Sequence, residues 1–168
     1  MNNITIENAR IMFRNFAGKE GKFNPAGRRN FCVFLDVDAA EGLKADGWNI
    51  KYLQGREEDD IPQPILQVTV NYDFMPPKLW VVTKRGKTLL DEDSVSALDW
   101  AELENVDITI RPYEWEVNGK TGVKAYIKSG YFTIREDELD DKYGDIPDNE
   151  GLSYRQQSED EEDRLPFK

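Results

Sequence analysis

Residues 106–134 read VDITIRPYEWEVNGKTGVKAYIKSGYFTI, and this segment contains the clearest structural pattern in the chain. Val106–Val117 and Thr121–Ile134 are rich in β-branched and aromatic residues, which favours two long strands. Between them stands Asn118-Gly119, the dipeptide that two-residue hairpin turns prefer. Pro112 has no backbone N–H, which predicts that the first strand lies at an edge or contains a bulge. The segment therefore predicts a long antiparallel hairpin.

Further strands are predicted on the N-terminal side of this hairpin. Apolar residues alternate along 4–16, but their phase changes near Ala9-Arg10, which predicts a long strand with a bend or bulge. Asn30–Val37 is apolar on both parities and is typical of a buried strand. Other strands are predicted at 48–53 and 65–72, and at 78–83, which pairs with 88–90 across a cationic turn.

Two short helical segments complete the expected fold. Asp38–Gly47 begins with a residue that can cap a helix and ends at a glycine, and Asp93–Leu103 has the apolar spacing of one or two helical turns, with Asp93 as its cap. Lys19–Arg29 contains three turn-forming residues and predicts an exposed basic loop. These elements predict a mainly β protein, an OB-fold-like antiparallel Greek-key barrel with one or two short helices. A β-sandwich is the alternative.

Charge divides the chain into two parts. The 168 residues have a net charge of -11, but residues 136–168 hold 13 acidic against 4 basic residues, a net of -9. The remaining residues, 1–135, are close to neutral, with 18 basic against 20 acidic side chains. Residues 144–168 are too polar and charged to form a core. We therefore expect a folded domain at 1–143 and a disordered acidic tail at 144–168.

Composition limits the chemistry that the chain can perform. With no histidine, imidazole metal sites and histidine-dependent catalytic triads are excluded. A single cysteine, Cys32, cannot form an internal disulfide, which fits a cytoplasmic location. No stretch has the roughly 20 apolar residues of a membrane span. Asp36 with Asp38, or Asp91 with Asp93, could hold Mg²⁺ in a nuclease, but helix capping explains them more simply. No catalytic residue, metal site or cofactor is predicted.

Basic and aromatic residues recur together along the body. Proteins that bind single-stranded nucleic acid combine a cationic groove for the phosphates with rings on which bases stack, each worth roughly 1–3 kcal/mol. A ring flanked at i±2 by Lys or Arg lies on a polar strand face, which favours Tyr113, Trp115 and Tyr126 over core aromatics. The candidate binding residues are Arg10, Arg14, Lys22, Arg28, Arg29, Trp80, Lys84, Arg85, Arg111, Tyr113, Trp115, Lys124, Tyr126 and Lys128.

The C-terminus carries the most specific motif. An acidic run at 158–163 precedes Leu165-Pro166-Phe167, an apolar tip that a purely solubilising tail would not need. This end resembles bacterial and phage single-stranded DNA-binding proteins, whose acidic tails end in a Pro-Phe or aromatic tip. Here Arg164 is inserted and Lys168 follows the phenylalanine. These departures favour a phage-encoded partner protein over a host protein as the one that binds this tip. The layout of residues 4–135 is also similar to that of the phage proteins.

This resemblance implies a function. It implies a non-enzymatic, phage-encoded protein of the host cytoplasm that coats and protects single-stranded DNA in replication, recombination and repair with little sequence specificity. Replication or recombination proteins would bind the tail through Asp160, Glu161, Glu162, Asp163, Leu165, Pro166 and Phe167. The tail would compete with DNA for the groove until DNA displaces it. Homo-oligomerisation stays open. The alternatives are an interaction module or virion component that binds no DNA, and a metal-dependent nuclease.

Overall fold

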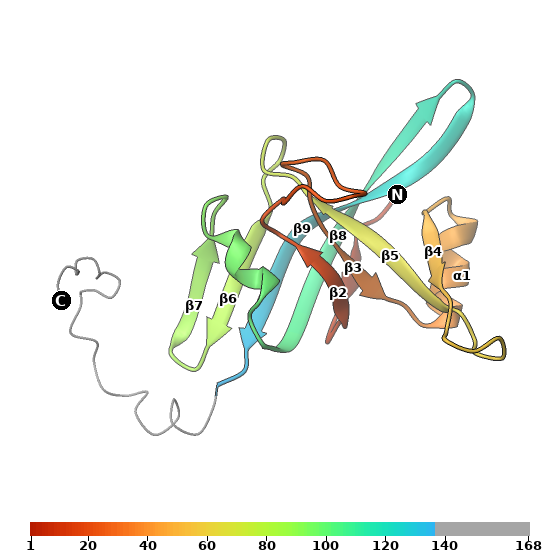
Figure 1. Ribbon diagram of the computed structural model, residues 1–168. Coiled ribbons are helices and arrows are strands. Elements are labelled where there is room, and N and C mark those ends of the chain that lie inside the picture. Colours follow the sequence, from red (N-terminus) through yellow and green to blue (C-terminus); the bar gives the residue numbers. More distant parts are fainter. Residues whose placement is uncertain (137–168) are drawn as a thin grey trace. The chain divides into compact units, whose positions relative to one another are not determined.

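The computed structural model describes residues 1–136, which form a mainly β structure (Figure 1). The elements are β1 (Ile4–Ile6), β2 (Ile11–Asn15), β3 (Arg29–Phe34), α1 (Val37–Ala45), β4 (Ile50–Leu53), β5 (Gln63–Val70), β6 (Lys78–Thr83), β7 (Gly86–Leu90), the 3-10 helix η1 (Val95–Asp99), β8 (Leu103–Val117) and β9 (Lys120–Ile134). The mainly β prediction is confirmed. The predicted domain boundary after residue 143 and the acidic tail lie outside the described residues.

The strands follow the path β1-β8-β9-β5-β3-β2 through one sheet. Its two ends, β1 and β2, are consecutive parts of the bent N-terminal strand, whose bend contains Asn8 at a φ of 53°. At this bend the Ala9 N–H donates to Val106 of β8, and Arg10 accepts from Phe34 at the end of β3. The sheet therefore curls back on itself as a partly open barrel, as in an OB-fold. Most pairs are antiparallel, as predicted, but β9 pairs in parallel with both β5 and β6.

Alternating side chains of these strands fill the barrel. Phe16 stacks on Phe31 with ring centroids 5.1 Å apart, and it meets Phe132 edge-on at 5.8 Å. All three rings are fully buried. Strand alternation places Val123 and Ala125 of β9 in the same core. The predicted buried strand at Asn30–Val37 corresponds to β3, whose residues 30–33 are buried, but β3 ends at Phe34 and Val37 is the exposed first residue of α1.

The β8–β9 hairpin has the predicted turn. Val117 pairs with Lys120, and both turn residues have positive φ, 52° at Asn118 and 79° at Gly119, as a type I′ turn requires. β1 pairs with β8 only as far as Ile110, so Pro112 lies on a part of β8 whose second edge β1 does not cover. This confirms the edge prediction. Figure 1 shows the end of the hairpin projecting from the sheet.

Two helix caps differ from the predictions. The cap of α1 is Asp36, not Asp38: its Oδ1 accepts from the Ala39 N–H at 2.7 Å. The turn before η1 is organised by Asp91, not Asp93, because Asp91 Oδ1 accepts from the backbone N–H groups of Asp93 and Ser94 at 2.9 Å. Asp36 stands where its side chain reaches a free N–H group in the first turn of α1, whereas Asp91 reaches the N–H groups of the turn that precedes η1. In the described residues, no helix is long and apolar enough to cross a membrane.

Candidate nucleic-acid interface

The outer face of β9 is a row of basic and aromatic side chains. Along this strand Val123, Ala125 and Ile127 point into the core, so Lys124 and Tyr126 point outward. The register then shifts, because Thr109 pairs with Ser129 while Ile110 pairs with Ile127. Lys128 is the extra residue of this β-bulge and is exposed. The bulge shifts the alternation by one residue, so that Phe132 points inward and Tyr131 lies on the outer face.

Predicted residues from β8 complete this row. Arg111 pairs with Tyr126 and Tyr113 pairs with Lys124, so the four side chains share one face. The two tyrosine rings meet edge-on with centroids 6.0 Å apart. The guanidinium of Arg111 and the ammonium of Lys124 lie 5.7 and 5.3 Å from the centroid of the Tyr126 ring. The structure thus brings four of the predicted binding residues into a single cationic and aromatic cluster.

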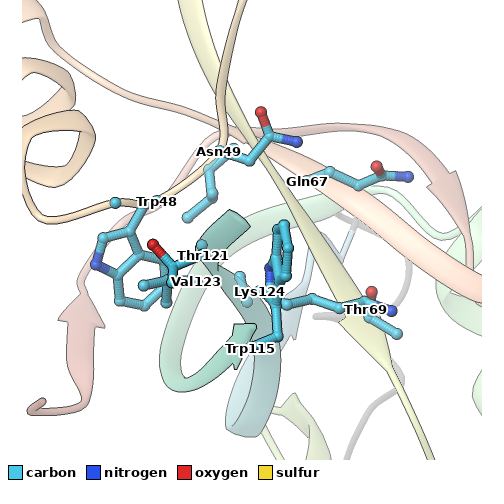
Figure 2. A pocket seen from close by; sticks show the side chains of 12 residues that line it. Trp48, Asn49, Gln67, Thr69, Trp115, Thr121, Val123 and Lys124 are labelled. Atoms are coloured by element: carbon cyan, nitrogen blue, oxygen red, sulfur yellow. The ribbon is translucent and has the colours of Figure 1, made fainter. Parts of the chain in front are cut away.

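Trp115 lies flat across the neighbouring strand because its partner is a glycine. A Cβ on Gly122 would come within 2.6 Å of Cζ2 of the indole. Trp115 keeps 39% of its surface exposed, although it is part of the wall of a cleft of about 540 Å³. Figure 2 shows the labelled side chains of this cleft, which come from β5, β8, β9 and the two residues before β4. They include Trp48, Asn49, Gln67, Thr69, Trp115 and Lys124.

A second hollow, of about 350 Å³, continues this cleft toward the basic loop at 16–28. Thr69 and Lys124 line both hollows, so the two hollows adjoin at these residues, and together we call them the outer groove. Its second half is lined by Arg28, Arg29, Tyr72 and Tyr126, together with Asp73 and Glu92. The outer groove therefore combines the partly exposed ring of Trp115 at one end with the Tyr126 ring and basic side chains at the other.

Arg29 and Tyr72 support each other at the basic end. Arg29 Nη1 donates to the Phe16 carbonyl at 2.6 Å and Nη2 lies 3.7 Å from Glu92, while the guanidinium covers the Tyr72 ring at 5.7 Å. Burial raises the pKa of Tyr72 to about 12, although the Arg29 charge opposes this shift. Among the described residues, the Tyr72 hydroxyl has no hydrogen-bond partner. Arg29 thus fastens the loop, whereas Arg28 is exposed.

Other predicted residues lie away from the outer groove. Arg14 Nη1 donates to the carbonyls of Leu98 and Ala101 at 2.9 and 2.8 Å, which holds η1 against β2. Arg10 covers the Phe34 ring at 4.6 Å and lines a separate hollow of about 300 Å³ with Arg14.

The remaining predicted residues lie in the basic loop and in the β6–β7 hairpin. Lys22 lies 5.4 Å from the ring of Phe23, which is 91% exposed in the basic loop. Trp80 belongs to β6, and Lys84 and Arg85 form the turn that follows it. The predicted tail residues from Asp160 to Phe167 lie outside the described residues.

Sequence reasoning missed several residues that line the outer groove. Gln67 and Thr69 lie on the outer parity of β5, because Thr69 pairs with Tyr126. Their alternation with buried Leu66 and Val68 was visible in the sequence and could have identified them. Trp48 and Tyr72 enter the groove only through long-range packing, for which the sequence contains no local signal.

The aspartates considered for Mg²⁺ have structural roles. Asp36 caps α1, and hydrogen bonds from the Ser94 side chain, then from backbone N–H groups, hold the pKa of Asp91 below its ordinary value. Within residues 1–136, no group of three or more Asp, Glu, Cys or His side chains is arranged to hold a metal ion.

Three comparisons with known proteins bear on this geometry. A family model described as a putative phage ssDNA-binding domain matches residues 1–165. The fold is similar to that of the single-stranded DNA-binding protein from bacteriophage Enc34 in complex with ssDNA, at 11% identity and a TM-score of 0.52, covering 80% of this chain and 88% of that one. A C-terminal truncation of the Enc34 protein matches with a TM-score of 0.50 at 11% identity, covering 80% and 87%. Among curated proteins, none matches.

Proposed function

Since the chain belongs to the family of putative phage ssDNA-binding domains, we propose that it binds single-stranded DNA along the outer groove and coats it during replication, recombination and repair. The observation that carries this proposal is that two adjoining hollows share Thr69 and Lys124 and are lined by basic and aromatic side chains. The Enc34 protein of similar fold was solved with ssDNA.

The position of the groove in the barrel supports the same function. In OB-folds, the face of the second and third barrel strands binds oligonucleotides, together with the loops between strands one and two and strands four and five. In this barrel those parts are β3, β5, the loop at 16–28 and the Asn118-Gly119 turn. The outer groove runs over β5 and is bordered by that loop and by the β8–β9 hairpin.

The side chains of the outer groove suit a ligand that carries phosphate charges and bases able to stack. Arg28 and Lys124 face the groove with charges for phosphates, and Trp115 and Tyr126 offer rings for bases. Phosphate contacts and stacking carry little sequence information, so we expect slight sequence preference. The net charge of -11 does not oppose this, because the local field of the groove governs binding.

We also propose that the acidic C-terminal residues recruit partner proteins. The supporting observation is the sequence, in which residues 159–163 are all acidic and Leu165-Pro166-Phe167 follows. A tethered segment of such charge competes with DNA at high effective concentration. Deleting residues 144–168 should tighten DNA binding at low salt and abolish capture of replication proteins. Unchanged affinity for DNA after the deletion would contradict competition.

Under this proposal the protein is not an enzyme and acts in the host cytoplasm. Asp36 and Asp91, the leading residues of the two carboxylate pairs, are engaged in capping and turn formation, which leaves the nuclease alternative without a supporting observation. Alanine substitution of either should therefore affect folding rather than confer or remove a Mg²⁺-dependent activity.

Tryptophan fluorescence during titration with oligo-dT tests the main proposal. We expect quenching by the single strand, weaker binding as salt rises, and little response to duplex of equal length. Lys124→Gln should lower the salt slope by about 1. Lys44→Gln is the matched control, because Lys44 lies on α1 over the Tyr52 ring at 5.3 Å. No response to either nucleic acid would overturn the proposal and favour a protein-interaction module.

A further inference from the structure

A second aromatic pair lies farther along the outer face of β9. Trp80 of β6 pairs with Tyr131 of β9, and their rings are almost parallel, with centroids 6.5 Å apart and an interplanar angle of 8°. Lys87 of β7 reaches across both rings, with its Nζ 4.4 Å from the Trp80 centroid and 5.5 Å from the Tyr131 centroid. Tyr131 is 42% exposed. We call these three side chains the hairpin platform.

The hairpin platform continues the row that begins in the outer groove. β5 pairs with β9 at Ala125 and Tyr126, and β6 pairs with the same strand from Ser129 to Thr133, so the two occupy successive stretches of it. Tyr126 and Tyr131 are five residues apart, about 16 Å at the rise of a strand. The β-bulge keeps both on the outer face and adds the exposed Lys128 between them. Lys78, opposite Ser129, is also exposed.

These rings are not needed to anchor the hairpin. The inner faces of β6 and β7 supply Leu79 and Leu90, both buried in the main core. Core packing thus fixes the hairpin from one side, while the aromatic pair and its lysine remain on the other side, partly in contact with water. Exposed rings next to a cation are the combination that binds a base and its phosphate.

We propose that the single-stranded DNA path extends from the outer groove along β9 to the hairpin platform, where a further base stacks and Lys87 neutralises its phosphate. This inference rests on the proposed function, because it lengthens the path assigned there. Its consequence is a footprint with two parts, so that short oligonucleotides fill the outer groove alone and longer ones occupy both.

The length of the oligonucleotide separates the two parts in an experiment. Affinities for an oligo-dT of about 6 and one of about 16 nucleotides, which span the site sizes of OB-folds, are measured on the full chain. For Trp80→Ala and for Lys87→Gln we expect about tenfold weaker binding of the long oligonucleotide and less than about twofold change for the short one. A long oligo-dT carrying 5-bromodeoxyuridine should crosslink to Trp80 or Tyr131.

Control variants keep the outcomes distinct. Lys44→Gln removes a lysine from another ring, Tyr52, and should leave both affinities unchanged. Trp80→Phe retains a stacking surface and should recover most of the long-oligonucleotide affinity. Equal losses for both lengths, or none for either, would overturn the extended path. If the unaltered protein bound neither oligonucleotide, the proposed function itself would fail, so the two failures are distinguishable.

Discussion

Both faces of β9 carry aromatic rings, but one face is buried and the other is exposed. Phe132 and Tyr131 are neighbours in the chain, yet Phe132 is fully buried against Phe16, whereas Tyr131 is 42% exposed beside Trp80. The inner row continues with Val123, Ala125 and Ile127, and the outer row contains lysines between its rings. An aromatic residue alone therefore does not indicate core or ligand site; the residues two positions away on the same face do.

The largest expected effect belongs to the inner face. Phe132→Ala should lower the free energy of unfolding by about 3–5 kcal/mol, because it removes a fully buried ring and leaves a cavity beside Phe16. Urea denaturation measures the change. Tyr131→Ala, on the opposite face of the same strand, should cost less than about 1 kcal/mol. Equal losses in the two variants would mean that the faces do not differ in this way.

An intermediate effect is expected on the outer face, in binding rather than in folding. Trp115→Ala should weaken oligo-dT binding by about 10- to 100-fold, as loss of one stacked base implies, with little change in stability. Gly122→Ala should do the same indirectly, because its methyl group displaces the indole. Trp100→Ala is the control, since Trp100 is 78% exposed and lies outside the lining of the outer groove. Isothermal titration compares the three; a loss in the control alone would contradict the assignment.

The smallest expected effect concerns Tyr72, which packs against the core on one side and lines the outer groove on the other. Its pKa is raised from 10.0 to about 12, mainly by burial, so the folded state favours the neutral phenol. The resulting stability is fully present below pH 10 and is lost as the pH rises through 12. Tyr72→Phe cannot ionise and should become more stable than the unaltered protein by of order 1 kcal/mol in that window, after allowance for water around the partly exposed ring.

Thermal unfolding at about pH 8 and about pH 11 measures the Tyr72 effect. At the lower pH the Phe variant should be equally stable or slightly more stable, because the Tyr72 hydroxyl is buried and has no hydrogen-bond partner among residues 1–136. An advantage that did not grow with pH would show that Tyr72 titrates as it does in the unfolded chain.

Local patterns predicted the strands but not their connections. Alternation and the Asn118-Gly119 turn gave the β8–β9 hairpin, because each signal lies within a few residues of its effect. The parallel pairing of β5 with β9 joins Val68 to Ala125, and no local pattern specifies such a distant partner. The cap of α1 was predicted two positions too late, because both aspartates at 36 and 38 satisfy the sequence rule and only the backbone geometry selects one.

The alternation of residues along a strand predicted which candidate side chains lie outside the core, whereas residue type alone did not predict which ones line the outer groove. The rule that rings flanked by Lys or Arg lie on a polar face correctly placed Tyr113, Trp115 and Tyr126 outside the core. Their role in binding DNA stays a prediction. Arg14 looked equivalent to Arg28 in the sequence, but it donates to carbonyls 84 and 87 residues away. Such partners are assembled by the fold and cannot be inferred from neighbouring residues.

The central place of β9 also determines when the barrel can form. β9 pairs with β8, β5 and β6, and it follows all three in the chain, while Ile4 at the start pairs with Ile110. During synthesis β2, β3 and β5 leave the ribosome first and can pair with one another, but β1 cannot pair with β8, nor β5 with β9, until those later strands are made. Pairings this distant are slow to close, typically in milliseconds to seconds. Until then the nascent chain exposes the edge of β5 that later pairs with β9, which makes translation a period of aggregation risk.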